Sequence, residues 1–239
     1  MKTKSVKWGI MAMALLSMAM PFTAKAQDKV EASVGADFVS NYIWRGTDCG
    51  GVSIQPSMGV SYKGLSLAAW GSVGIDKEDA REIDLTLGYT TGGFNVSVTD
   101  YWFSYHKEDG GYTGDYFKYG AHSTVHIFEA TLGYDFGPLA LSWNTYFAGD
   151  DYTKENGDRA YSTYVGISAP FKLGGLDWSA EVGLTPWEGA YANKFNVTNL
   201  TLKAEKEIKF TNYFSLPTFA QVTFNPHTQG AYFVFGVSF

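Results

Sequence analysis

The chain ends with Gly230-Ala231-Tyr232-Phe233-Val234-Phe235-Gly236-Val237-Ser238-Phe239, in which apolar residues recur at every second position. Successive side chains of a β-strand point to opposite faces, so Phe233, Phe235 and Phe239 share one apolar face. At the edge of a soluble sheet this face would be an aggregation hazard. In a closed transmembrane barrel it faces lipid, and neighbouring strands pair with its backbone on both sides. The stretch therefore predicts the closing strand of a membrane β-barrel.

The same alternation recurs in about twelve segments between residues 27 and 239. Ile83 and Leu85, for example, alternate with Glu82 and Asp84. We expect one all-β domain over residues 27–239, a single transmembrane antiparallel β-barrel of about twelve strands. A soluble antiparallel sandwich would show the same period, but it does not predict the terminal aromatic strand.

One segment, residues 94–105, changes phase in its middle. Its apolar residues occupy first one parity and then the other: Phe94, Val96 and Val98, followed by Tyr101, Phe103 and Tyr105. If the first parity continued, Asp100 would face lipid. One extra residue shifts the pattern by one position, so we expect a β-bulge near Thr99-Asp100.

The connections between the segments alternate in length. Short ones fall at 63–64, 91–93, 137–138, 173–175 and 211–212, and long ones fall at 46–51, 76–80, 106–124, 149–159, 188–195 and 225–229. Outer-membrane barrels have short periplasmic turns and longer extracellular loops. We therefore expect the long loops to be extracellular and both termini to be periplasmic.

Aromatic residues gather near both ends of the predicted strands, as they do in the two girdles that mark the interfaces of a membrane. Near the short turns lie Tyr62, Tyr89, Phe94, Tyr134, Phe136, Phe171 and Phe214, and near the long loops lie Tyr42, Trp44, Phe103, Tyr105 and Phe147. Two girdles predict that outer-membrane lipid surrounds the barrel.

Residues 1–26 have the features of a cleaved secretory signal peptide. Lys2, Lys4 and Lys7 form a basic start, Trp8–Met20 forms an apolar run, and Ala24-Lys25-Ala26 forms a small-residue cleavage site. The apolar run is too short to span a bilayer as a helix. Export, followed by barrel formation, predicts the bacterial outer membrane as the location.

The charge balance narrows the range of partners. Removing residues 1–26 takes four of the 18 basic residues and none of the 24 acidic ones, so the net charge falls from −6 to −10. Nucleic-acid binding requires clustered basic residues, so we expect no nucleic-acid partner.

The polar parity of the predicted strands carries charges that would face the lumen. The candidates are Asp37, Arg45, Glu82, Asp84, Glu129, Asp135, Asp177, Glu181, Lys203 and Glu205. Acids outnumber bases among them, and a buried charge is costly unless it is paired or hydrated. We expect a hydrated lumen that favours cations or neutral polar solutes. A plug of internal salt bridges without conductance is the alternative, since twelve strands lie between the filled interior of about eight and the open porins of about sixteen.

The longest predicted loop, residues 106–124, contains four glycines and the aromatic residues Tyr112, Tyr116, Phe117 and Tyr119. We expect these four aromatic side chains to pack inside the barrel mouth as a gate. Their rings and hydroxyls would offer contacts to small polar solutes. An external lid or an adhesive surface loop is the competing interpretation.

The sequence does not predict catalysis, a metal or a cofactor. His122, His126 and Glu129 are residue types that suit zinc or copper, but Glu129 would point away from the two histidines along a strand. A lipid hydrolase of the phospholipase type would need a serine, a histidine and a polar orienting group to meet near the lipid face. His122 and Ser123 are adjacent and would point apart. The single cysteine, Cys49, cannot form an internal disulfide and has no predicted role.

Three further stretches resemble a known family. They are Val39-Ser40-Asn41-Tyr42-Ile43-Trp44-Arg45-Gly46-Thr47-Asp48, Leu85-Thr86-Leu87-Gly88-Tyr89 and Val98-Thr99-Asp100-Tyr101-Trp102. Together with the C-terminal strand, they are similar to the TorF-type porins of the bacterial outer membrane. The resemblance spans most of the mature chain. It implies an outer-membrane location and a pore, and it carries over no catalytic residues.

The terminal aromatic strand also resembles the signal by which the barrel-assembly machinery recognises outer-membrane barrels, with Phe239 as the insertion signal. The expectation from the sequence is thus a narrow porin for small polar or cationic solutes. A non-conducting structural or adhesive barrel is the alternative, and a barrel-embedded lipid hydrolase is a further one.

Overall fold

The computed structural model describes residues 29–107, 111–121 and 123–239. All regular secondary structure in these residues is β, and none of them forms a helix long and apolar enough to cross a membrane. The predicted signal peptide, residues 1–26, lies outside the described residues.

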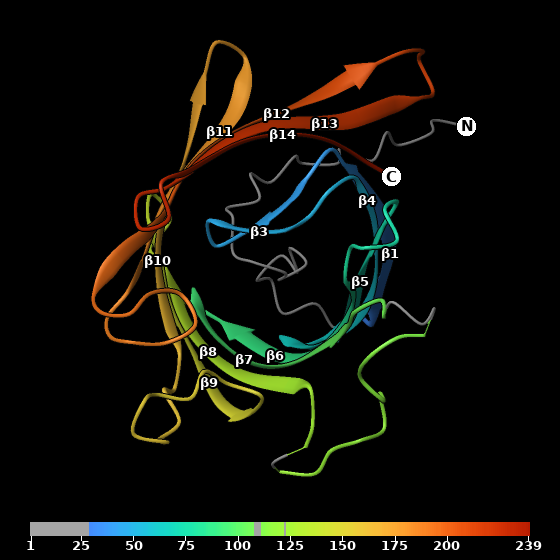
Figure 1. The fold of residues 1–239 in the computed structure, drawn as a ribbon. Coiled ribbons are helices and arrows are strands. Elements are labelled where there is room, and N and C mark those ends of the chain that lie inside the picture. Colours follow the sequence, from blue (N-terminus) through green and yellow to red (C-terminus); the bar gives the residue numbers. More distant parts are fainter. Residues whose placement is uncertain (1–28, 108–110, 122) are drawn as a thin grey trace.

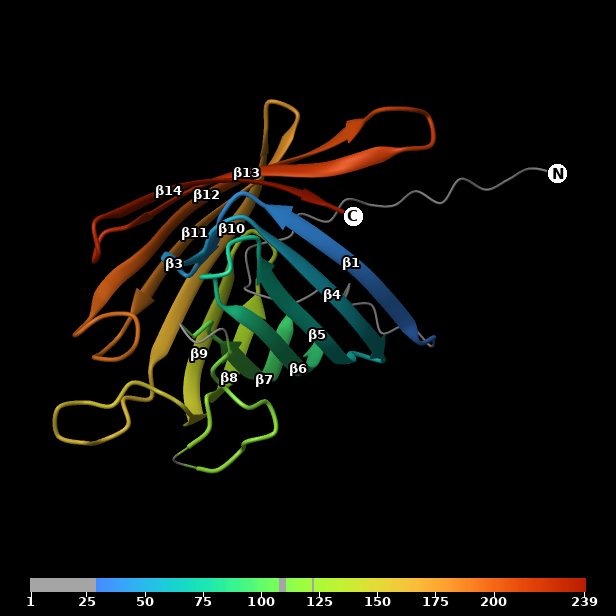
Figure 2. The same cartoon turned by 45° about the vertical axis from the view of Figure 1, so that its right-hand side comes forward.

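Twelve strands close into one antiparallel barrel, which Figure 1 shows as a ring and Figure 2 shows obliquely. They are β1 (Glu31–Val39), β4 (Ser53–Tyr62), β5 (Leu65–Gly74), β6 (Arg81–Thr91), β7 (Phe94–Ser104), β8 (His126–Asp135), β9 (Ala140–Gly149), β10 (Thr163–Leu173), β11 (Leu176–Thr185), β12 (Asn196–Lys209), β13 (Ser215–Asn225) and β14 (Gly230–Ser238). The predicted fold class, a single antiparallel barrel of about twelve strands, is confirmed.

The C-terminal strand closes the ring, as its sequence predicts. β14 pairs with β13 on one side and with β1 on the other. At the seam the Phe239 N–H donates to the Ala36 carbonyl at 3.0 Å, and the Ala36 N–H donates to the Phe239 carbonyl at 3.2 Å. Because this pair sits at the end of the β1–β14 ladder, Phe239 contributes directly to closure. Its role as an insertion signal stays a prediction.

Short and long connections alternate around the barrel. The short ones join β4 to β5, β6 to β7, β8 to β9, β10 to β11 and β12 to β13, at residues 63–64, 92–93, 136–139, 174–175 and 210–214. The longer ones leave the opposite end of the barrel. The alternation predicted from the sequence is confirmed except at 226–229, where the connection is no longer than the short ones at 136–139 and 210–214. The orientation of the two ends relative to a membrane stays a prediction.

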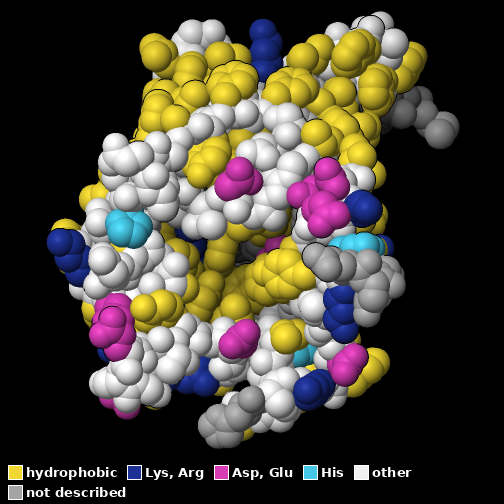
Figure 3. Space-filling model, viewed as in Figure 1, with side chains coloured by type: hydrophobic (Ala, Val, Ile, Leu, Met, Phe, Trp, Pro, Cys, Tyr) yellow, Lys and Arg dark blue, Asp and Glu magenta, His cyan; other side chains and the backbone are white. Residues whose placement is uncertain are grey.

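The outside of the barrel wall is apolar. Large hydrophobic side chains are exposed along alternate positions of most barrel strands, among them Val34, Ile54, Leu67, Leu87, Val96, Leu132, Leu141, Val182, Leu202 and Phe233. Figure 3 shows such side chains gathered over the outside of the wall near β12–β14, at the top of that view. Soluble monomers rarely expose a continuous apolar surface of this kind, whereas a lipid-facing barrel requires one.

The aromatic residues of the short-turn girdle all lie exposed on this wall: Tyr62, Tyr89, Phe94, Tyr134, Phe136, Phe171 and Phe214. At the long-loop end Tyr105 and Phe147 are also exposed. The other three predicted members, Tyr42, Trp44 and Phe103, instead belong to or pack against buried groups inside the barrel. For these three residues the girdle prediction is wrong.

The predicted bulge at Thr99-Asp100 is also wrong. β7 pairs with β6 and β8 in unbroken register there, with Asp100 opposite Leu85 and Phe128. Tyr101 therefore points into the lumen, where it is 2% exposed, and Asp100 stays on the outer wall. The phase of the apolar pattern changes because the lumen has its own aromatic core in this region, not because the strand slips.

The two remaining strands, β2 (Tyr42–Trp44) and β3 (Thr47–Gly50), form a separate hairpin. Val39 at the end of β1 pairs directly with Ser53 at the start of β4, so the wall is continuous without the residues between them. Figure 1 shows the hairpin inside the ring of strands. The connection predicted at residues 46–51 therefore begins earlier, because the chain leaves the wall after Val39.

Candidate functional site in the barrel lumen

The tip of the β2–β3 hairpin reaches the opposite wall. Arg45 and Gly46 form its two-residue turn with φ of 51° and 80°, and this turn type requires positive φ at both positions. The Asn225 side chain donates to the Gly46 carbonyl at 3.0 Å. A Cβ added to Gly46 would come within 1.9 Å of the Thr198 carbonyl oxygen. Only glycine therefore lets the tip approach β12 this closely.

Arg45 fixes the hairpin to the wall through a buried ion pair. Its Nη1 and Nη2 donate to Oε2 and Oε1 of Glu129 on β8 at 2.6 and 2.9 Å. Both side chains are only 2% exposed. Two parallel N–H···O bonds are the strongest geometry available to this kind of pair. Removing one partner would leave an uncompensated buried charge, which is strongly destabilising.

Aromatic residues surround this ion pair. The Arg45 guanidinium lies 4.3 Å from the ring centre of Trp44 and 4.7 Å from that of Tyr164. The Tyr101 hydroxyl donates to Glu129 at 2.9 Å, and Arg45 Nη1 donates to the Tyr191 hydroxyl at 2.5 Å. The faces of Trp44 and Tyr164 therefore stabilise the Arg45 cation, while the hydroxyls of Tyr101 and Tyr191 add hydrogen bonds to Glu129 and Arg45 respectively. The hairpin, Glu129 and these rings form one rigid unit across the lumen.

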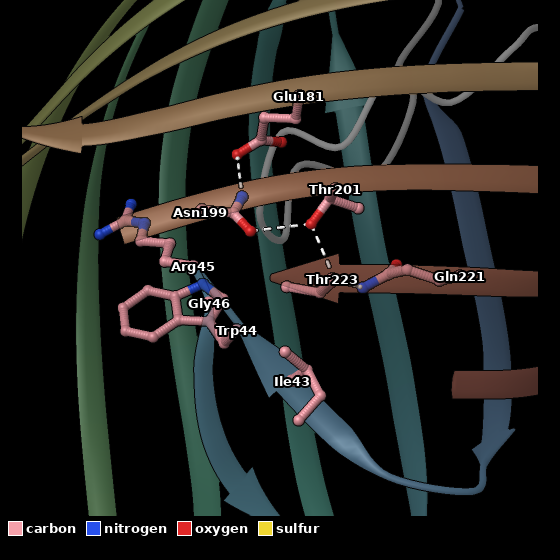
Figure 4. Close-up of a pocket in the computed structure, with 9 residues that line it drawn as sticks. All are labelled: Ile43, Trp44, Arg45, Gly46, Glu181, Asn199, Thr201, Gln221 and Thr223. Carbon is pink, nitrogen blue, oxygen red and sulfur yellow. Dashed lines mark hydrogen bonds between the residues drawn. The ribbon is translucent and has the colours of Figure 1, made fainter. Parts of the chain in front are cut away.

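A polar pocket remains between the hairpin and the β11–β13 wall, and Figure 4 shows its lining. Ile43, Trp44, Arg45 and Gly46 form one side, and Glu181, Asn199, Thr201, Gln221 and Thr223 form the other. The pocket has a volume of about 60 Å³, so it is large enough to hold water.

The wall of the pocket is a continuous row of hydrogen bonds. Asn199 Nδ2 donates to Glu181 at 3.0 Å, the Thr201 hydroxyl donates to Asn199 at 2.8 Å, and the hydroxyls of Thr201 and Thr223 lie 2.8 Å apart. Gln221 Nε2 donates to Thr223 at 3.0 Å. Amides and hydroxyls at this spacing present both donors and acceptors, so the row suits water or small polar solutes.

The structure separates the predicted lumen charges into two zones. Arg45, Glu82, Asp84, Glu129 and Glu181 are buried around the hairpin. Asp37 is half-buried on β1 near the seam with β14. The others lie towards the short turns: Asp135 is exposed, Asp177 pairs with Lys172 at 2.5 Å, and Lys203 pairs with Glu205 at 2.6 Å. The buried charges thus gather in the central zone, around the hairpin.

The aromatic residues of the long loop do not pack inside the mouth, so that part of the gate prediction is wrong. The Arg81 guanidinium stacks on the Tyr112 ring at 3.8 Å, and Phe117 is 88% exposed. Tyr116 and Tyr119 pack on His126, with ring centres 5.3 and 4.3 Å apart. His126 shares its parity with Phe128 on the outer wall of β8, so these tyrosines cover the outside of the barrel.

His126 attaches this loop to the wall. Its Nδ1 lies 2.7 Å from Asp100 Oδ1, and its Nε2 lies 2.7 Å from the Tyr116 carbonyl oxygen. A carbonyl can only accept, so Nε2 carries a proton and donates. The ring is 0% exposed. His122, the histidine considered for a lipid hydrolase, lies outside the described residues.

We expect the His126→Ala variant to release the loop from the wall. A hydrogen bond to a charged group contributes roughly 1.5–3 kcal/mol, so losing the imidazole should speed cleavage of the folded barrel by trypsin at Lys107 and Lys118 about tenfold or more. The matched control is Phe117→Ala in the same loop, which removes an exposed ring. Equal cleavage rates in the two variants would contradict the attachment.

The fold and the lumen define a class: a transmembrane-type β-barrel with an apolar outer wall and an internal hairpin. No protein-family model matches the chain, and no curated protein matches it. The resemblance to the TorF-type porins is therefore not confirmed.

Two solved structures are similar to the chain. One is BamA from Haemophilus ducreyi lacking POTRA domains 1–3, at 11% identity and a TM-score of 0.38, covering 81% of this chain and 41% of that one. The other is the beta domain of the Bordetella autotransporter BrkA, at 14% identity and a TM-score of 0.29, covering 87% of this chain and 97% of that one. The chain thus spans less than half of the BamA chain. Because both TM-scores are low, the assignment to the barrel class depends on the strand pairing and the apolar outer wall of this chain itself.

Proposed function

We propose that the protein is a narrow channel of the bacterial outer membrane, constricted by the β2–β3 hairpin, that passes small polar or cationic solutes. Support for the membrane comes from the exposed apolar wall, which outer-membrane lipid would cover. Closure by β14 and its terminal Phe239 supports insertion by the barrel-assembly machinery. The predicted periplasmic turns and extracellular loops follow from the same arrangement.

The observation that carries the channel is the polar pocket beside the hairpin. A barrel that served only as a scaffold would gain stability from a packed apolar interior, whereas this one buries carboxylates, amides and hydroxyls around a cavity. Carboxylates set the sign of the electric field in a pore, so the central acids favour cations. The role proposed is transport, and it involves no catalytic residue.

The alternative is a non-conducting barrel, and the Arg45–Glu129 pair is the observation that favours it. This pair ties the hairpin across the lumen through two short hydrogen bonds. A hairpin held in this way narrows the lumen permanently unless solutes pass through the pocket at its side.

Reversal potentials distinguish the two functions. In planar bilayers with a potassium chloride gradient, we expect residues 27–239 to pass potassium more readily than chloride. Replacing Glu82 and Glu181 by glutamine and Asp84 by asparagine should weaken this preference, because the field in the lumen becomes less negative. Exchanging the exposed Glu155 for glutamine is the control and should change nothing. Verified folding without measurable current would support the non-conducting barrel.

A further inference from the structure

A second group of side chains lies on the other side of the hairpin from the pocket. Glu82 and Asp84 are two residues apart on β6, so both point into the lumen. They are 4% and 1% exposed. Tyr42 on β2 lies against them and is 9% exposed. Its ring packs on Trp70 of β5, with the ring centres 5.6 Å apart.

The polar atoms of this group converge without satisfying one another. The Glu82 side chain interacts with both Tyr42 and Asp84. Within the described residues, neither carboxylate oxygen of Asp84 nor the hydroxyl of Tyr42 makes a hydrogen bond of normal geometry. Buried polar atoms are usually hydrogen-bonded, and those that are not indicate a ligand or a functional role.

The arginines of the hairpin turn and of β6 are directed elsewhere. Arg45 donates to Glu129 and Tyr191. Arg81 precedes Glu82 on β6, so its side chain points to the outer wall, where its guanidinium stacks on Tyr112. The two carboxylates therefore create a site of negative potential that a positively charged ligand would neutralise.

From this geometry we propose that Glu82, Asp84 and Tyr42 bind the primary ammonium group of a small organic cation. An ammonium group has three N–H donors and one positive charge. The site offers three oxygen-bearing side chains, two of which are carboxylates. The rings of Tyr42 and Trp70 pack together next to it, with Trp70 paired to Asp84 across the β5–β6 ladder, and aromatic rings attract cations. Within the described residues, no group of three or more His, Cys, Asp or Glu could hold a metal ion.

The position of the site agrees with a transported ligand. Glu82 is the second residue of β6, next to the long loop before that strand, and Asp84 lies further down the wall. A cation that arrives from the long-loop mouth would meet Glu82 first and Asp84 next. The proposal deepens the channel function and rests on it for the route, while binding itself requires no current.

Ligand-induced stabilisation tests the site. The folded protein in detergent is heated in methylammonium chloride or tetramethylammonium chloride at equal ionic strength, and unfolding is followed by circular dichroism. A ligand that binds the folded state raises the midpoint temperature. Methylammonium has three donors and tetramethylammonium has none, so we expect methylammonium to give the higher midpoint. This difference should be lost in Asp84→Asn and Glu82→Gln.

Two further variants keep the test decisive. Tyr42→Phe removes one hydroxyl and keeps the ring, so it should reduce the difference even if a carboxylate variant fails to fold. Glu181→Gln alters a buried lumen carboxylate whose partners are Tyr164 and Asn199, and it should retain the difference. Equal midpoints for the two salts in the unmodified protein would overturn the proposal, as would equal loss in Glu181→Gln. Binding without current would reject the channel and keep the site.

Discussion

Replacing Arg45 by methionine should lower the free energy of unfolding of the barrel by about 3–5 kcal/mol, the range for breaking a buried ion pair. Methionine keeps much of the side-chain volume, so the loss reflects the charge left on Glu129. That carboxylate is 2% exposed and, within the part of the chain that the structure describes, would keep its hydroxyl partners Tyr101 and Thr131. Urea titration of the folded protein in detergent or lipid measures the change.

A double-mutant cycle isolates the ion pair from other effects. Glu129→Gln should also destabilise the barrel. The double variant Arg45→Met/Glu129→Gln should lose less unfolding free energy than the sum of the two single losses, because no unpaired charge then remains buried. The control is Lys172→Met, which breaks the pair with Asp177, in which the lysine is 77% exposed. Exposed pairs contribute at most about 1 kcal/mol. If Arg45→Met lost no more unfolding free energy than Lys172→Met, the stabilising role of the buried Arg45–Glu129 pair would be contradicted.

The wall of the barrel could be predicted from the sequence because membrane burial imposes a strict pattern. Ile83 and Leu85 must face lipid while Glu82 and Asp84 face the lumen, and a period of two records this directly. Alternating connection lengths gave the strand order, since hairpins with short turns leave little topological choice. The final strand was recognisable because one of its faces is almost entirely apolar, as a lipid-facing strand requires.

The content of the lumen could not be predicted in the same way. A hairpin inside the barrel alternates with the same period as a strand in the wall, so Tyr42 and Trp44 read as a continuation of β1. The close approach of Gly46 to Thr198 depends on residues far apart in the chain. Arg45 and Glu129 were recognised as lumen charges, but their pairing is a tertiary contact. Tyr191, in the loop between β11 and β12, has no periodic signal at all.

The outer surface shows a further limit of the pattern. Asp100 breaks the apolar parity of β7, and a bulge is the local explanation for such a break. In the structure the cause is a contact between residues far apart in the sequence. His126 from the next strand pairs with Asp100 at 2.7 Å beneath the long loop. A single charge on a lipid-facing parity therefore predicts either a shift in register or a covered partner, and the sequence alone does not decide between them.

The second large effect concerns the hairpin itself. Val39 and Ser53 are paired in the wall, so residues 41–51 can be replaced by an Asn-Gly turn between Ser40 and Val52. This change removes Arg45 and the constriction but keeps every barrel strand. We expect the single-channel conductance to rise several-fold, because among the described residues the wall side chains and the loop carrying Tyr191 are then what remains in the lumen of the twelve-stranded barrel.

Shortening the long loop at residues 107–123 is the matched control. Its aromatic side chains lie on the outer wall, so its removal should leave the conductance unchanged. An increase in this control that exceeds the increase after hairpin replacement would restore the loop as the gate.

The most direct measurement is therefore the single-channel conductance of the hairpin-replaced barrel beside that of the intact protein, in the same planar bilayer and salt. A constricted channel predicts a small current for the intact protein and a several-fold larger one after replacement. Equal currents from two correctly folded proteins, or none from either, would contradict the account.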